Sequence, residues 1–274
     1  MSCTATHHQR GFTLIELIMV IVILGVISAM VAVFMKSPMD AYFASARRAA
    51  LTDVADTAVR RMARDIRKAL PNSVRLCSAG TNGVMFIPTK TGGRYRTVDV
   101  TAGDGTALDF AAADTRFNML GNNNDWPANQ RIASGDVIAV YNLGISGADA
   151  YANENTATVS GVAAGTETTI TLSAGKQFPL ESGSNRFHVI PAAEKVVAYV
   201  CSGSQLIRAT SSTLANSCPT AGSVLADQVG SCTFVYNGSD LQRNALVQIT
   251  LRFTDNSSGE SVNLYHEVHV DNTP

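Results

Sequence analysis

The sequence of 274 residues predicts an α+β fold, in which one long N-terminal helix packs on an antiparallel β-sheet. Three observations lead to this prediction. An uncharged apolar run occupies residues 17–35, an amphipathic helical pattern follows it as far as Leu70, and short β-rich segments fill the rest of the chain. This length is compatible with one large domain or two small ones, and it suffices for a substantial core.

The composition limits the classes of partner. Charged residues make up 16% of the chain, below the roughly 25% of an ordinary soluble domain, and the formal net charge is -1. Binding of nucleic acid through charge requires a basic field that displaces counterions, so no nucleic-acid partner is expected. The hydrophobic share of 46% is too high for general disorder.

The apolar run of residues 17–35 is almost long enough to span the hydrocarbon core of a membrane. It holds 19 residues without a charge, and apolar residues extend back to Phe12 apart from Thr13 and Glu16. At about 1.5 Å per residue it nearly crosses a hydrocarbon core of about 30 Å. Residues 12–35 are therefore predicted as a transmembrane helix. A buried helix of a soluble protein is the alternative, but the run lies at the extreme N-terminus.

An ordinary signal peptide is a second alternative. Such a peptide has an apolar core of about 7–15 residues and a small-x-small cleavage site soon after it. The run is longer than that, and the nearest such site, Ala44-Ser45-Ala46, lies well beyond Met35. Glu16 is also badly placed for a signal peptide. A carboxylate just inside a spanning helix costs free energy, so Glu16 is a functional candidate that requires a partner.

The N-terminal segment resembles the class III signal of type IV pilins and type II secretion pseudopilins. The residues that carry the resemblance are Arg10, Gly11, Phe12, Thr13, Leu14, Ile15, Glu16 and Leu17, followed at once by the apolar run. The resemblance implies that a prepilin peptidase cleaves between Gly11 and Phe12 and that Phe12 is then N-methylated. Residues 1–11 would be the leader, and Glu16 would be the fifth residue of the mature chain.

A physical argument gives Glu16 a role within this resemblance. Cleavage leaves Phe12 with a free amine, which must enter a low-dielectric helical bundle when subunits pack together. Glu16 of a neighbouring subunit is the obvious counter-charge, because opposite charges attract strongly in a poor dielectric and offset each other's desolvation. The hypothesis is that Glu16 selects the register in which a subunit joins a filament, so that other major and minor pilins are partners through the N-terminal helix.

Charge alone does not orient the spanning segment. The leader offers Arg10 with two histidines, whereas Lys36, Arg47 and Arg48 follow the apolar run, so the positive-inside count is weak or reversed. The resemblance implies that the leader stays inside. It implies a single pass through the inner membrane with a periplasmic head, and later a place in a pilus or pseudopilus at the cell surface.

Residues 36–71 are predicted to form the amphipathic half of the same helix. Pro38, next to Ser37, is expected to kink the helix between its halves, and Pro71 with Asn72 is expected to stop it. Opposite charges four residues apart predict two pairs, Asp56–Arg60 and Arg61–Asp65. The apolar stripe consists of Leu51, Val54, Ala55, Ala58, Met62, Ile66 and Leu70.

Basic residues gather near the end of this half. Arg64, Arg67 and Lys68 suit the negative end of a helix dipole. The cluster is interpreted as a solvated helix face, with an anionic-lipid or nucleic-acid patch as the alternative.

Residues 72–274 are predicted to form a β-rich extracytoplasmic head. Residues 101–185 are poorer in apolar patterning and are interpreted as long insertions. Several of the β-rich segments alternate apolar and polar side chains, as half-buried antiparallel strands do. The predicted strands are residues 84–87, 136–141, 168–172, 187–190, 196–200, 233–236, 247–253 and 262–270.

The cysteines suit an oxidising compartment. Cys3 lies in the predicted leader, and the even set Cys77, Cys201, Cys218 and Cys232 remains. Four cysteines allow three pairings; Cys201–Cys232 is favoured because two late strands could be neighbours, which leaves Cys77–Cys218. A zinc site is the alternative, but the chain has no C-x-x-C pair, and no metal is expected.

Further blocks resemble one kind of minor pilin, the MshO-type proteins of mannose-sensitive haemagglutinin (MSHA) pilus systems. These blocks are residues 60–75, 88–96, 232–236 and 266–274. The J-type minor pseudopilins of type II secretion share the same general plan. The resemblance implies a low-abundance subunit that primes filament assembly at the tip. The chain departs from major pilins in its size and in lacking a proline inside the apolar run.

No catalytic constellation stands out. The sequence has no phosphate loop, no G-x-S-x-G and no H-E-x-x-H, so neither an enzyme nor a cofactor is expected. The oxygens of residues 122–125 could bind calcium, although they lack the pattern of an EF-hand and are interpreted as a surface turn. His266 and His269 would lie on opposite faces of a strand. Trp126 is interpreted as a loop staple rather than an exposed binding anchor.

Three classes of function follow. The first is a structural subunit, a minor pilin or pseudopilin that helps to initiate or cap a filament after processing by a prepilin peptidase, with the inner membrane as its location before assembly. The second is a tip adhesin that binds a surface or glycan through the insertions near residues 101–185. The third, a membrane-anchored enzyme, has no supporting residues.

Overall fold

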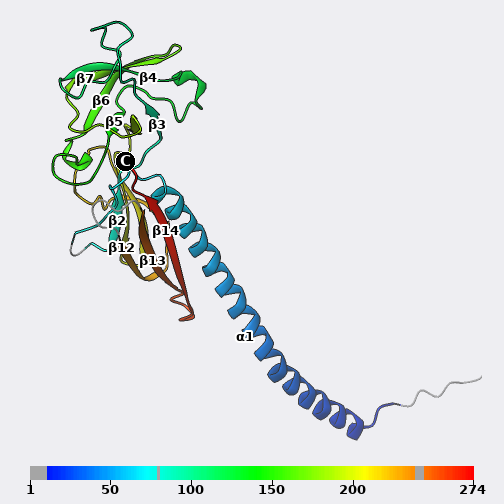
Figure 1. Ribbon diagram of the computed structural model, residues 1–274. Helices are drawn as coiled ribbons and strands as arrows, with labels where there is room; N and C mark the ends of the chain where they lie inside the picture. Colours follow the sequence, from blue (N-terminus) through cyan, green and yellow to red (C-terminus); the bar gives the residue numbers. More distant parts are fainter. Residues whose placement is uncertain (1–10, 79–80, 238–243) are drawn as a thin grey trace, which may run out of the picture. The chain divides into compact units, whose positions relative to one another are not determined.

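The computed structural model describes residues 11–78, 81–237 and 244–274. Residues 1–10, which include Cys3 and most of the predicted leader, lie outside the described residues. The chain divides into two compact units, Met1–Ala50 and Leu51–Pro274. One helix, α1 (Leu14–Ile66), begins in the first unit and ends in the second (Figure 1). The remaining elements of the described residues are antiparallel strands and two short 3₁₀ helices, η1 (Asn123–Asp125) and η2 (Ala150–Ala152), so the predicted α+β class is confirmed.

Helix α1 is 53 residues long and contains Pro38, so the chain stays helical through the position of the predicted kink. Its end differs from the prediction. The helix ends at Ile66 rather than near Leu70. The amide of Arg67 still bonds four residues back, to Ala63 O, whereas the amides of Lys68 and Ala69 bond three residues back, to Asp65 O and Ile66 O. Such bonds tighten and close the last helical turn. Asn72 then adopts a left-handed conformation, with φ of 58°.

The predicted apolar stripe is largely confirmed. Five of its residues in the helix are buried: Leu51, Ala55, Ala58, Met62 and Ile66. Leu70, which follows the helix, is buried too. Val54 was wrongly included, since it is 44% exposed. It precedes Ala55 by one residue, a step of about 100° around a helix, which moves it off the buried face.

Two sheets cover the buried stripe of α1. Strands β1 and β2 begin the first sheet, and its order is β1-β2-β9-β10-β11. The second sheet has the order β12-β13-β14. Their strands are β1 (Arg75–Leu76), β2 (Gly83–Phe86), β9 (Val196–Ser202), β10 (Gln205–Ser211), β11 (Gly222–Ala226), β12 (Val229–Asn237), β13 (Asn244–Thr254) and β14 (Ser261–Asp271). One core cluster joins the helix to both sheets through residues such as Met62, Tyr199 and Ile249.

A third sheet, of six strands, has the order β3-β8-β5-β6-β7-β4. Its two edges meet. Tyr95 and Met119 form an antiparallel bridge, flanked by bonds of 2.9 Å from Arg96 N to Asn118 O and from Leu120 N to Arg94 O. The sheet therefore closes as a small barrel around its own core. Its strands are β3 (Thr91–Arg94), β4 (Asp114–Met119), β5 (Val137–Val140), β6 (Thr156–Ala163), β7 (Thr168–Lys176) and β8 (Arg186–Ile190).

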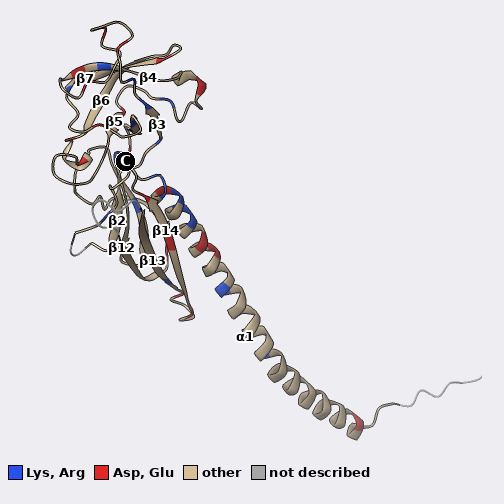
Figure 2. Ribbon diagram, viewed as in Figure 1, with Lys and Arg blue, Asp and Glu red and all other residues tan. Residues whose placement is uncertain are grey.

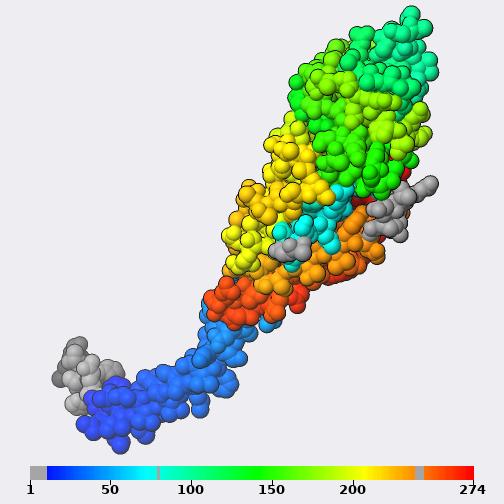
Figure 3. Space-filling view, turned by 90° about the vertical axis from the view of Figure 1, so that its left-hand side faces the viewer, coloured from blue at the N-terminus to red at the C-terminus, as the bar shows by residue number. Residues whose placement is uncertain are grey.

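The barrel corrects the interpretation of residues 101–185 as insertions. This segment supplies four of the six barrel strands and the buried side chains of Phe117 and Ile170. Figure 3 shows this part of the chain, in green, gathered at one end of the unit Leu51–Pro274, with the later strands in yellow to red at the other. All eight predicted strands occur, whereas β1, β3, β4, β6, β10 and β11 were not predicted.

A third core cluster joins the barrel to the five-stranded sheet. It includes Leu70, Met85, Val137 and Ile190, all buried. Hydrogen bonds between distant loops strengthen this junction. Asn142 Nδ2 donates to Pro71 O at 2.7 Å, and the hydroxyl of Tyr151 donates to Ser73 O at 2.8 Å. The turn that follows α1 is thereby fixed to the barrel.

Two disulfides cross-link the unit Leu51–Pro274. Cys201 of β9 is bonded to Cys232 of β12, which ties the five-stranded sheet to the three-stranded sheet. Cys77, just after β1, is bonded to Cys218 in the connection between β10 and β11. This is the pairing that the sequence favoured. None of these four cysteines is therefore a free thiol that could ligate zinc.

Candidate functional site: an uncovered apolar helix behind a capping box

Helix α1 begins with a reciprocal capping arrangement. The backbone N–H and the hydroxyl of Thr13 both donate to Glu16 Oε2 at 3.0 Å, and the hydroxyl of Thr13 accepts from Glu16 N at 3.4 Å. This is a capping box, which satisfies backbone donors that a helix start otherwise leaves unpaired. Glu16 therefore fixes where the helix starts in its own chain. This role was not predicted, although the spacing T-x-x-E of Thr13 and Glu16 is a readable signal for it.

Gly11 has no structural reason to be glycine. It is exposed, it is absent from the residues with positive φ, and a Cβ added to it would meet nothing within 4 Å. The neighbouring Phe12 is 87% exposed. Because the fold itself accepts a side chain at position 11, a requirement for glycine there would come from a molecule that reads this segment. The segment is exposed and precedes the helix, so a protease could reach it.

The apolar part of α1 is uncovered. Every residue from 11 to 43 is exposed, including the whole run of residues 17–35. The helix is long and apolar enough to cross a membrane by length and composition, and none of its most apolar stretch is buried. Figure 2 shows this part of α1 as a long tan stretch with little charge. The alternative of a helix buried in the chain's own core is contradicted.

The exposed apolar surface of α1 is unstable in contact with water. Apolar area in contact with water costs about 25 cal/mol per Å², so a run of this length demands a cover. A helix satisfies all its interior backbone groups internally, which makes it suited to lipid. Within the part of the chain that the structure describes, nothing covers this stretch.

A second feature lies where α1 meets the five-stranded sheet. Arg208 of β10 forms two parallel hydrogen bonds to Glu194, of 2.9 and 2.8 Å, and donates from Nε to Asp65 of α1 at 3.0 Å. The hydroxyl of Tyr199 also donates to Asp65, at 2.7 Å. The predicted pair Arg61–Asp65 is therefore wrong, because Asp65 binds the sheet instead. The predicted pair Asp56–Arg60 is confirmed, at 2.6 Å.

The electrostatics of this network follow from its contacts. The bidentate bond from Arg208 lowers the pKa of Glu194 below its ordinary value of 4.5. Burial, followed by the bond to Asp65, raises the pKa of Tyr199. At neutral pH the carboxyl is therefore ionised and the phenol is protonated, which makes the network a clamp between helix and sheet.

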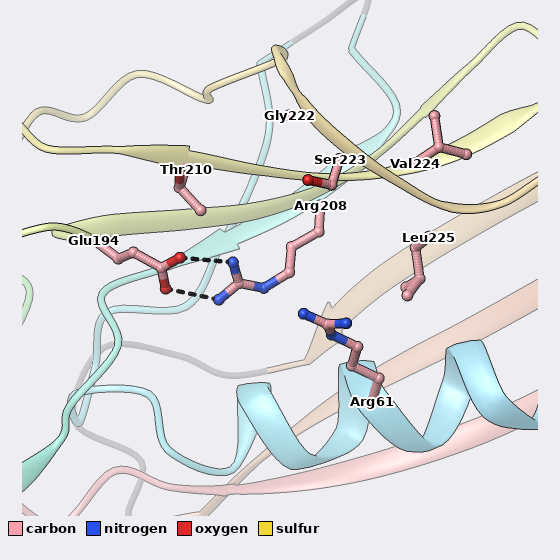
Figure 4. Close-up of a pocket in the computed structure, with 8 residues that line it drawn as sticks. All are labelled: Arg61, Glu194, Arg208, Thr210, Gly222, Ser223, Val224 and Leu225. Carbon is pink, nitrogen blue, oxygen red and sulfur yellow. Dashed lines mark hydrogen bonds and ion pairs between the residues drawn. The ribbon is translucent and has the colours of Figure 1, made fainter. Parts of the chain in front are cut away.

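A small pocket of about 140 Å³ adjoins this clamp (Figure 4). Arg61 reaches it from α1, facing the Arg208–Glu194 pair, and the remaining lining side chains are hydroxyl-bearing or aliphatic. Glu194 is held by Arg208 and is a poor base. No group of three or more His, Cys, Asp or Glu that could hold a metal is found among the described residues.

In the loop considered for calcium, residues 122–125, two side chains are hydrogen-bonded to the chain's own backbone. Asn123 is buried, and its side-chain amide exchanges two hydrogen bonds with the backbone of Ile132, of 2.8 and 3.0 Å. Asn122 Oδ1 accepts from Asn124 N at 2.9 Å, which caps the 3₁₀ helix η1 (Asn123–Asp125). The segment is thus partly buried rather than a plain surface turn, and these two amide oxygens bind the chain's own backbone.

Two smaller predictions have clear outcomes. Trp126 packs, partly buried, against the barrel core, as a loop staple does. His266 and His269 lie on opposite faces of β14, where His266 is half-buried and His269 exposed. The two histidines therefore share no site.

Comparison with known proteins yields one match. Residues 6–32 match the prokaryotic N-terminal methylation motif. The match covers the predicted cleavage and methylation residues and most of the apolar run, and it stops well before the head. No curated protein and no solved structure matches the chain. The motif supports a type IV pilin-like or pseudopilin subunit, a structural class whose class III signal implies processing by a prepilin peptidase followed by assembly.

Proposed function

We propose that this protein is a subunit of a type IV pilus or a type II secretion pseudopilus. It is made as a precursor with residues 1–11 as the leader, is cleaved between Gly11 and Phe12, and is then N-methylated at Phe12. The observation that carries the proposal is the uncovered apolar helix, most of whose apolar run lies within the residues that match the methylation motif. A soluble protein has no use for such a surface, whereas a filament subunit requires it.

Before assembly, residues 12–35 anchor the chain in the inner membrane as a single pass, with the head in the periplasm. Two disulfides in the head suit that oxidising compartment. On assembly the helix exchanges lipid for the helices of other subunits. Both surroundings are apolar, so the hydrophobic effect opposes the exchange only weakly. Packing and charge then decide where the subunit is placed.

Glu16 supplies the charge. In the assembled filament its carboxylate pairs with the Phe12 amine of a neighbouring subunit, and within its own chain it closes the capping box with Thr13. The two roles can be separated by substitution. Glutamine at position 16 keeps the box, since glutamine serves in it as glutamate does, but it removes the charge. Alanine removes both.

The test compares Glu16→Gln with Glu16→Ala in cells that lack the native gene. We expect both variants to accumulate in the membrane and both to lose incorporation into filaments, by about tenfold or more, because a counter-charge in poor dielectric is worth well over 1.4 kcal/mol. Immunoblots of sheared filaments and of membranes give the ratio. Normal incorporation of Glu16→Gln would leave only the capping role and overturn the pairing.

Within this class, a minor subunit of the MshO kind that initiates or caps an MSHA-like pilus fits best. The size of the head, its separate barrel and the absence of a proline in the apolar run all differ from a bulk subunit. A tip adhesin is the second candidate. The observation that favours it is the barrel, whose loop at residues 97–106 exposes Val98 and Val100.

Deletion of the gene separates the two roles. Loss of all filaments indicates a role in initiation, and complementation with the native gene should restore them. Normal filaments that no longer adhere indicate an adhesin. Normal filaments with normal adhesion would contradict both roles.

A further inference from the structure

Strand β14 is a free sheet edge. The three-stranded sheet has the order β12-β13-β14, and its β12 side is tied to the five-stranded sheet by the disulfide Cys201–Cys232. Among the residues that the structure describes, strand β14 pairs only with β13, in a register that runs without a shift from Asn244↔Asp271 to Thr254↔Ser261. About half of the backbone N–H and C=O groups of such a strand point away from its one neighbour.

This edge has few of the features that protect a sheet edge from another strand, and its carboxylates are Glu267 and Asp271. Proteins commonly shield edges with proline, lysine, a bulge or a short strand. Strand β14 has 11 residues, about twice the typical length, and it contains no proline, lysine or arginine and no bulge. A long, regular edge of this kind is suited to the addition of a strand from another chain.

A basic groove runs beside this edge. It has a volume of about 470 Å³ and lies between α1 and the half-buried His266 of β14. Val59 and Ala63 are its buried apolar residues. The other helix residues that line it are charged: Asp56, Arg60, Arg64 and Arg67.

The groove carries unbalanced positive charge. Asp56 is paired with Arg60, at 2.6 Å. Arg64 and Arg67 have no ion-pair partner among the residues that the structure describes. The buried Nε2 of His266 likewise lacks a hydrogen-bond partner within the described residues. Arg64, Arg67 and Lys68 are exposed, which confirms the interpretation of the basic cluster as a solvated helix face, and the two arginines also line this groove.

We propose that the β14 edge and this arginine groove together bind an extended acidic segment of another protein. The segment adds to the sheet as a fourth strand, by backbone hydrogen bonds to β14. In a strand every second side chain lies on the same face, so alternate residues of the segment would face α1. Carboxylates at those positions would meet Arg64 and Arg67, which bind carboxylates through charge-assisted, often bidentate hydrogen bonds. The inference holds whether or not the chain enters a filament.

The test uses the full chain in detergent and a fluorescent peptide that alternates glutamate and threonine. Its binding is measured by polarisation. A peptide with lysine in place of glutamate tests the charge, and a peptide with N-methylated backbone amides tests the strand pairing. We expect the glutamate peptide to bind and each of the two altered peptides to bind at least about tenfold more weakly.

Variants of the protein locate the site. Arg64→Glu and Arg67→Glu should each weaken binding of the glutamate peptide by about tenfold. Arg186→Glu, an identical charge change at an exposed barrel position, should leave binding within about twofold. Equal binding of the glutamate and lysine peptides, or equal binding by Arg64→Glu and Arg186→Glu, would overturn the proposal. Undiminished binding of the N-methylated peptide would overturn strand addition.

Discussion

The two ends of helix α1 differ in one respect that matters. From residue 12 to residue 43 no side chain is buried, whereas from Leu51 to Ile66 a continuous stripe is buried beneath two sheets. Both ends are the same secondary structure in one unbroken helix. The difference lies in the pattern of side chains, which is apolar on all sides in the first part and on one side in the second. The apolar stripe of the second part is covered by the sheets of its own chain. The apolar surface of the first part is not covered by the described residues.

The largest expected effect comes from a matched pair of truncations on the two parts. Ile66→Ala should lower the free energy of unfolding of the head by about 2–5 kcal/mol, since Ile66 is fully buried in the core. Ile23→Ala removes the same atoms from an uncovered position and should leave unfolding of the head unchanged. Denaturant unfolding of both variants, followed by near-UV circular dichroism in detergent, measures the pair. Equal losses of unfolding free energy in Ile66→Ala and Ile23→Ala would contradict the stated difference between the two parts of α1.

Loss of the Cys201–Cys232 disulfide should act on the head alone. Replacing both cysteines by alanine should cost about 2–4 kcal/mol, because the bond constrains the unfolded chain and ties two sheets together. Membrane association should not change, since the proposed anchor, residues 12–35, lies outside the head. Carbonate extraction of membranes, run beside the unfolding measurement, checks this. Release of the variant from the membrane would show that the two parts depend on each other.

A smaller effect is expected from the clamp between α1 and the sheet. Arg208→Ala leaves Asp65 and Glu194 without their cation and should cost about 1–3 kcal/mol at neutral pH. The pKa of Glu194 is lowered in the folded state, so its contribution is present above about pH 4.5 and is lost as the pH falls through the folded value.

The gap in stability between the native protein and Arg208→Ala should therefore narrow below pH 4.5. Unfolding curves at neutral pH and at successively lower pH measure this gap. If the difference in free energy of unfolding stayed constant over this pH range, Glu194 would not contribute to the stability of the clamp.

The sequence predicted the parts of the fold in which large apolar residues repeat regularly. Residues 247–253 alternate strictly, and they lie in β13. The barrel was missed because its strands are rich in small and polar residues. Strand β6 reads TATVSGVA, which has few large side chains to reveal a period of two.

The candidate site was predictable where its contacts are local. The capping box of Thr13 and Glu16 spans three residues and can be read directly from the sequence. The partner of Asp65 could not be read, because Arg208 is 143 residues away and only the fold brings the two together. The sequence predicted Arg61 as the partner of Asp65. Asp65 binds Arg208 instead, because a network of several hydrogen bonds is stronger than one exposed ion pair on a helix.

The most direct test of the account is the N-terminus of the protein isolated from its native membrane, by intact mass and N-terminal peptide sequencing. The account predicts a chain that begins at methylated Phe12, with Gly11 and all preceding residues removed. A chain that begins at Arg47, after the small-x-small site Ala44-Ser45-Ala46, would identify an ordinary secreted protein. That result would remove the uncovered half of α1 from the mature molecule and contradict the proposed filament subunit.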